Sequence, residues 1–128
     1  KVAIDRVHAE NNGTGFKANA TNGSISETIR ESVAAANTST GVQGTGTGVI
    51  SMIMDHTAVV NNGVGAVGTG ILADTSSNVT IRISDVTVSG NPVGLSTSGG
   101  AKISSFGDNH ISGNATDGAP TPPNIPVL

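Results

Sequence analysis

Apolar and polar residues alternate in short runs along the chain, and asparagine and glycine separate these runs at regular intervals. Val79, Ile81 and Ile83 alternate with polar residues, which is the period-2 pattern of a β-strand with one buried face. No segment carries a convincing helical stripe of apolar positions. The best helical candidate, residues 27–37, occupies a place in the repeat where the other repeats have strands, so we expect strand there as well.

An asparagine recurs along the chain at gaps of 25, 25, 29 and 23 residues, and a glycine follows three positions later in most copies. A period in this range, with one turn residue per copy, is the signature of a solenoid in which each repeat forms one coil. Asparagine tolerates left-handed backbone, and its amide can bond backbone groups and a second asparagine stacked above it. We therefore expect a ladder made of Asn12, Asn37, Asn62, Asn91 and Asn114.

The repeats divide the chain into about five coils over residues 1–114 and a tail over residues 115–128. The tail holds four of the five prolines, which cannot donate to a sheet ladder, so we expect it to lie across the end of the coils or in solvent. The 29-residue gap contains about four extra residues, which we place in a bulging loop over residues 63–70. The residues expected to point inward include Val7, Ile29, Val33, Ile53, Ile81, Val86, Val88, Leu95, Ile103 and Ile111.

The repeated turns of asparagine, two further residues and glycine resemble those of the right-handed parallel β-helix superfamily, the pectate-lyase-like fold. More narrowly, residues 59–63 (Val-Val-Asn-Asn-Gly) and 113–121 are similar to the C-terminal part of bacterial proteins that contain such repeats. The resemblance covers nearly the whole chain and implies an all-β fold, a right-handed parallel β-helix (β-solenoid) of about five coils. It implies much less about function, because one fold hosts many activities.

Composition limits the classes of partner. Six Lys and Arg against nine Asp and Glu give a net charge of −3, which argues against nucleic acid and against an anionic membrane surface. The chain has no cysteine and therefore no disulfide or thiol chemistry, and no apolar run approaches the ~20 residues of a membrane helix. The chain starts at Lys1 and carries no signal peptide, so we interpret it as a processed protein or a piece of a longer one.

An acidic residue precedes the asparagine region in every repeat: Asp5, Glu31, Asp55, Asp85 and Asp108. Enzymes of the resembled superfamily act mostly on polysaccharides and use carboxylates on a strand face, sometimes with Ca²⁺, Arg or His. Asp85 and Asp108 are the candidate catalytic pair, since stacking one coil apart, roughly 4.8 Å, would let them bind Ca²⁺ or share a proton. The competing interpretation is that all the acids are solvated or turn-capping residues at strand ends.

Histidine offers weaker candidates. Asp55 and His56 are neighbours, but adjacent strand residues point to opposite faces, which argues against a pair. His8, His56 and His110 could form a column, yet three histidines without thiols or a tight spacing are weak evidence for zinc, so no metal site is predicted.

Two functional hypotheses follow. The favoured one is a non-catalytic β-solenoid module of an exported bacterial protein, extracellular or at the cell surface, with a structural or surface-interaction role. The alternative is the C-terminal part of a polysaccharide-active lyase or hydrolase, although only Phe16 and Phe106 could offer aromatic faces to a sugar.

Thr-rich segments within residues 38–47 do not recur at the coil period, which argues against an ice-binding array. Residues 1–4 show no cap, so we also expect self-association through that end, or a cut from a longer solenoid.

Overall fold

The computed structural model describes residues 1–128 and contains fourteen β-strands and no helix. In chain order the strands are β1 (Val2–Asp5), β2 (His8–Glu10), β3 (Thr14–Asn19), β4 (Ser24–Arg30), β5 (Val33–Ala35), β6 (Thr40–Thr45), β7 (Val49–Asp55), β8 (Ala58–Val60), β9 (Thr69–Ala73), β10 (Val79–Ser84), β11 (Thr87–Ser89), β12 (Val93–Thr97), β13 (Lys102–Ser105) and β14 (His110–Ile111).

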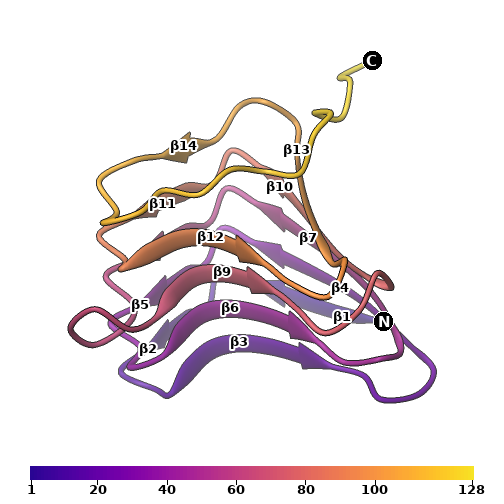
Figure 1. The fold of residues 1–128 in the computed structure, drawn as a ribbon, viewed down its shortest axis with the longest axis horizontal. Coiled ribbons are helices and arrows are strands. Elements are labelled where there is room, and N and C mark those ends of the chain that lie inside the picture. Colours follow the sequence, from indigo (N-terminus) through magenta and orange to yellow (C-terminus); the bar gives the residue numbers. More distant parts are fainter.

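The strands form three parallel sheets, and each complete coil contributes one strand to each sheet. Sheet A has the order β1-β4-β7-β10-β13, sheet B the order β2-β5-β8-β11-β14, and sheet C the order β3-β6-β9-β12. The chain crosses the front of the molecule along sheet C, returns behind it, and climbs by one coil per turn in a right-handed sense (Figure 1). The predicted β-solenoid is confirmed, with four complete coils and a fifth that has only β13 and β14.

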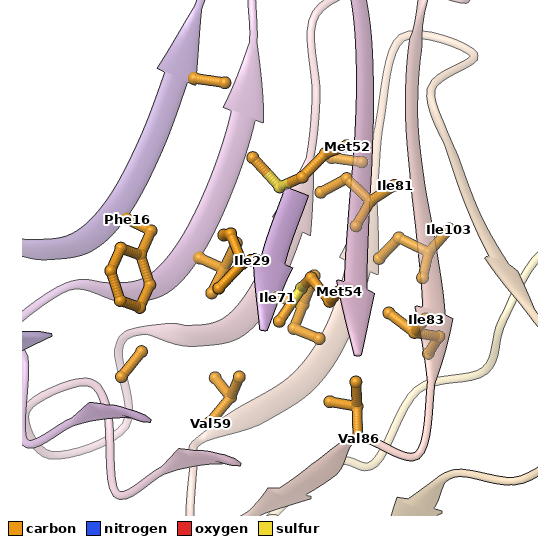
Figure 2. Close-up of a cluster of buried hydrophobic side chains, with 14 of the residues drawn as sticks. Phe16, Ile29, Met52, Met54, Val59, Ile71, Ile81, Ile83, Val86 and Ile103 are labelled. Atoms are coloured by element: carbon orange, nitrogen blue, oxygen red, sulfur yellow. The ribbon is translucent and has the colours of Figure 1, made fainter. Parts of the chain in front are cut away.

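The interior is filled by aliphatic side chains from all three sheets. Figure 2 shows Ile81 of sheet A, Val59 of sheet B and Ile71 of sheet C pointing into one common core. These side chains stack in columns, because equivalent strand positions pair in register from coil to coil, as Met52, Ile81 and Ile103 do. Small aliphatic residues suffice for this core, since each coil is covered by its neighbours along the axis.

Six of the ten residues predicted to point inward are buried: Ile29, Ile81, Val86, Val88, Leu95 and Ile103. Val33 and Ile111 are half-buried. The predictions for Ile53 and Val7 were wrong, because these side chains are 40% and 41% exposed. In β7 the inward set is Ile50, Met52 and Met54, and Ile53 lies on the opposite face of the same apolar run. Val7 follows a left-handed residue, Arg6, which interrupts the strand alternation.

The longest repeat carries its extra residues in one place, as predicted. Thr40 and Thr69 are partners in register, yet Thr40 lies three positions after Asn37 and Thr69 lies seven after Asn62. The four additional residues form a small hairpin closed by an antiparallel bridge between Val64 and Val67. This hairpin projects from the corner between β8 and β9 (Figure 1).

The two ends of the solenoid differ. After β14 the tail runs back across the last coil, where Thr116 bridges Val93 and the Thr121 N–H donates to the Ile103 carbonyl at 2.6 Å. Farther on, the Ile125 N–H donates to the Ser105 carbonyl at 2.8 Å. The tail therefore lies across the C-terminal end (Figure 1). At the other end β1, β2 and β3 are edge strands of their sheets.

Candidate functional site: the charged corner between sheets A and B

Each complete coil turns from sheet A to sheet B at a single residue with left-handed backbone. The φ angle is 53° at Arg6, 46° at Glu31, 47° at His56 and 48° at Asp85. Positive φ is uncommon outside glycine, and its repetition at four successive levels stacks these residues into one line. We call these four residues the corner column.

The residues just before the corner column form a second line, at the ends of the sheet A strands. Asp5 pairs in register with Arg30, Arg30 with Asp55, and Asp55 with Ser84. The acids that precede the asparagines in successive repeats are therefore divided between two lines. Asp5 and Asp55 lie at strand ends, whereas Glu31 and Asp85 lie in the corner column. Asp5 and Asp55 each lie one position before the corner residue of their coil, whereas Glu31 and Asp85 are themselves corner residues.

The two lines place opposite charges beside one another in the first two coils. Arg6 Nε lies 3.2 Å from Asp5 Oδ2 and 3.3 Å from Glu31 Oε2. Arg30 Nη2 lies 3.9 Å from Glu31 Oε1. Charge thus alternates both along the chain and from coil to coil. All four side chains are largely exposed, so each pair contributes only about 0–1 kcal/mol to stability.

His56 continues this pattern into the next two coils. Its Nδ1 lies 3.0 Å from Asp55 Oδ1 and its Nε2 lies 2.9 Å from Asp85 Oδ2. The prediction that Asp55 and His56 point apart was wrong, because His56 is a left-handed corner residue and the strand alternation does not apply to it. The hydrogen bond and charge of Asp55, followed by the charge of Asp85, raise the pKa of His56 above its usual value of 6.5.

We expect the His56 pKa measured by NMR to fall on Asp55→Asn and to fall less on Asp85→Asn, since Asp55 is the larger cause of the shift. A raised folded-state pKa means that this cluster stabilises the fold fully below pH 6.5 and loses that contribution as pH rises through the raised pKa. An unchanged His56 titration in both variants would contradict the pairing.

Asp85 and Asp108, the predicted acid pair, are both close to the corner but have separate partners. Asp85 binds His56, while Asp108 Oδ2 accepts a hydrogen bond from Ser84 Oγ at 2.9 Å. The pKa of Asp108 is lowered, mainly by the backbone N–H of Asp85; desolvation opposes this shift, and the hydrogen bond from Ser84 Oγ adds a smaller lowering. A general acid requires the opposite shift. No group of three or more His, Cys, Asp or Glu side chains converges as a metal site. Ca²⁺ between Asp85 and Asp108 stays the untested alternative that accompanies the polysaccharide-active hypothesis.

The three histidines do not form one cluster. His8 and His110 lie in the same line of sheet B, but at its opposite ends, because three strands separate β2 from β14. His8 Nδ1 lies 3.7 Å from Glu10 Oε1, and His56 is at the corner instead.

The asparagines stack at the next corner, between sheets B and C, as predicted. Asn37 Nδ2 donates to Asn62 Oδ1 at 2.8 Å, and Asn62 and Asn91 Nδ2 donate to the next Oδ1 in the column at 3.1 and 2.9 Å. Asn114 ends the column by donating to Asp117 Oδ1. At the other end Asn12 joins only through its backbone N–H, which donates to Asn37 Oδ1, while its amide donates to the Glu10 carbonyl.

Glu27 is a residue that the sequence interpretation missed. It lies between Ile25 and Ile29 on the inward face of β4 and is 5% exposed. Its carboxyl group faces an open hollow of about 600 Å³ at the N-terminal end, lined also by Val2, Ile4 and Phe16. Partial burial beside this hollow raises the pKa of Glu27 above its usual 4.5, because it disfavours the charged carboxylate. The sequence signal that could have identified Glu27 is the alternation in β4, which places it on the same face as Ile25 and Ile29.

We expect Glu27→Gln to stabilise the fold at pH 7 by less than about 1 kcal/mol, because it removes a partly desolvated charge whose cost is reduced by the solvent in the open hollow. Because the folded-state pKa is raised, the free energy of unfolding of wild type is highest, compared with that of the variant, below pH 4.5. It falls as pH rises through the raised pKa, since the carboxyl group then ionises in the folded protein. The two proteins should therefore have similar stability in acid. Urea unfolding at pH 4 and pH 7 measures this, with Glu10→Gln on the surface as control. A variant less stable than wild type at pH 7 would contradict it.

Comparison with known protein families, with curated proteins and with solved structures finds no match to this chain. Membership of the pectate-lyase-like superfamily and bacterial origin therefore stay predictions from the sequence. The fold also has no helical segment with the length and apolarity needed to cross a bilayer.

Proposed function

We propose that this chain is a non-catalytic β-solenoid module of an exported bacterial protein, extracellular or at the cell surface, with a structural or surface-interaction role. The observation that supports this most is where the repeated polar residues make their contacts. The asparagines bond to neighbouring coils of the same chain, and the repeated acids pair with Arg, His or Ser across the corner. The residues that recur in the sequence thus have a role in holding the coils together.

The chemistry at Asp85 and Asp108 also favours this role over catalysis. Hydrolysis of a glycosidic bond uses two carboxyl groups, one of which stays protonated because its pKa is raised. Here the pKa of Asp108 is lowered and Asp85 is paired with His56. Both carboxylates lie on an exposed outer corner, where no concave surface surrounds a substrate.

An activity assay tests the proposal. The chain is incubated with a panel of pectins, alginates and other acidic polysaccharides, with and without Ca²⁺, while unsaturated products and new reducing ends are measured. We expect no product above the protein-free rate. Product that Asp85→Asn and Asp108→Asn abolish, but Glu10→Gln leaves unchanged, would establish the alternative, a lyase or hydrolase. Crystal density for Ca²⁺ or an oligogalacturonate against Asp85 and Asp108 would also contradict the proposal.

A further inference from the structure

The outer face of sheet B carries an apolar strip on two adjacent strands. The strip consists of the outward side chains of β5 and β8, which are Val33, Ala35, Ala58 and Val60. Each of the four is half-buried, whereas Ala34 and Val59 between them are fully buried in the core. The strands on either side, β2 and β11, present polar side chains outward. An apolar centre with a polar border is the usual composition of a protein interface.

The strip is complementary to itself when two copies meet face to face with their coils running in opposite directions. The register places Val33 beside Ala58 and Ala35 beside Val60. A two-fold axis parallel to the strands and midway between β5 and β8 therefore sets Val33 against Ala58 of the second copy. It likewise sets Ala35 against Val60. A larger side chain faces a smaller one in every pair, so the two sheets can pack closely without voids.

The corner column beside sheet B supplies a second, independent observation. Its charges alternate from coil to coil: Arg6 is positive, Glu31 negative, protonated His56 positive and Asp85 negative. Glu31 and His56 each lie two positions before the first residue of β5 or β8, so the same axis also runs between them. Arg6 then faces Asp85 of the second copy, and Glu31 faces His56. An axis through either strand would instead set like charges against each other.

We propose that this chain forms a two-fold dimer in which the outer faces of sheet B pack together, with the coils antiparallel and the axis between β5 and β8. The apolar strip contributes most of the affinity. The charge order selects the axis, because exposed ion pairs contribute little to affinity but opposed like charges are costly. The contact is centred on the second and third coils and closes after two copies. This inference goes beyond the proposed function and does not depend on it.

The first test is sedimentation velocity and light scattering of the full chain just below pH 6.5, where His56 is protonated. We expect wild type to reach twice the chain mass of 12.6 kDa, with a Kd on the order of 10–100 µM because the contact is small. Ala58→Arg places bulk and charge at the centre of the strip and should weaken the dimer about a hundredfold. Ser96→Arg makes the same change at a half-buried outward position of sheet C and should leave the dimer intact.

The second test identifies the axis by charge exchange. Glu31→Lys sets two positive charges against each other in its own dimer, and His56→Glu sets two negative charges against each other. Each variant alone should dimerise about tenfold more weakly than wild type. In an equimolar mixture the two variants should pair with each other about as tightly as wild type, because every substituted position then meets the opposite charge. Energy transfer between differently labelled copies measures this pairing.

Three results overturn the proposal. One is a wild-type chain that is monomeric up to about 1 mM. Another is a dimer that a folded Ala58→Arg variant does not weaken, because it then uses a different surface. The third is a mixture in which the two charge variants show no preference for each other. If Ala58→Arg lowers the melting temperature, the mixture of charge variants decides the outcome.

Discussion

Asn62→Ala lowers the free energy of unfolding by about 4 kcal/mol, which is the largest effect that we expect from a single truncation. Asn62 is fully buried at the centre of the asparagine column. Its Nδ2 donates to the Ala34 carbonyl at 3.0 Å and to Asn91 Oδ1 at 3.1 Å. Its Oδ1 accepts from both the backbone N–H and the side-chain amide of Asn37.

Alanine leaves several of these groups without a partner. The Asn37 N–H loses its acceptor and the Ala34 carbonyl loses its side-chain donor, in a place that water does not reach. Each such unsatisfied buried group costs about 1–3 kcal/mol. A hydrophobic residue of similar size, as in Asn62→Leu, should be no better, because it fills the space without restoring any bond.

Chemical denaturation of Asn62→Ala and wild type, with the slope checked for two-state behaviour, measures this effect. The matched control is Asn12→Ala, which truncates an exposed member of the same column whose amide bonds only the Glu10 carbonyl. We expect the control to cost less than about 1 kcal/mol. Equal losses in the two variants would show that burial within the column does not set the energy.

Gly41→Ala is expected to cost about 3 kcal/mol, for a reason of space. A Cβ at Gly41 would lie 2.5 Å from Val59 Cγ1, 2.8 Å from Asn62 Nδ2 and 2.8 Å from the Gly70 carbonyl oxygen. Two of these contacts involve backbone or column atoms that cannot move without breaking hydrogen bonds. The substitution therefore disturbs the asparagine column from the side of sheet C.

Gly13→Ala is the control for this prediction. Gly13 is exposed, and an added Cβ has no atom within 4 Å. The control should stay within about 0.5 kcal/mol of wild type. Thermal and urea unfolding of both variants provide the comparison, and a Gly41→Ala protein as stable as the control would contradict the packing described here.

The glycines beside the asparagine column show which structural positions the sequence pattern identifies and which it misses. The register aligns Gly15, Gly41, Gly70 and Gly94, and a Cβ at each would lie within about 3 Å of a column Nδ2. The rule of a glycine three positions after the asparagine finds the first and last of these. In the longest repeat it selects Gly65, which is in the hairpin and has open space around it. The hairpin insertion displaces the structural glycine along the sequence.

The sequence by itself determined the solenoid, the asparagine column and the location of the four-residue insertion. These features depend on local chemistry repeated at a fixed period: alternation within strands, and an asparagine at each bend. Such information survives in a linear pattern, because every coil repeats it.

Only the tertiary structure decided which face of β7 is inward, which acids share a line, and that His56 bridges Asp55 and Asp85. The run around Ile53 is apolar on both faces, so alternation alone could not choose between them. The acids and His56 depend on left-handed corner residues, each of which resets the direction of the side chains that follow. The stacking of one coil on the next sets these contacts, and residues about 25 positions apart in sequence meet only when that register exists.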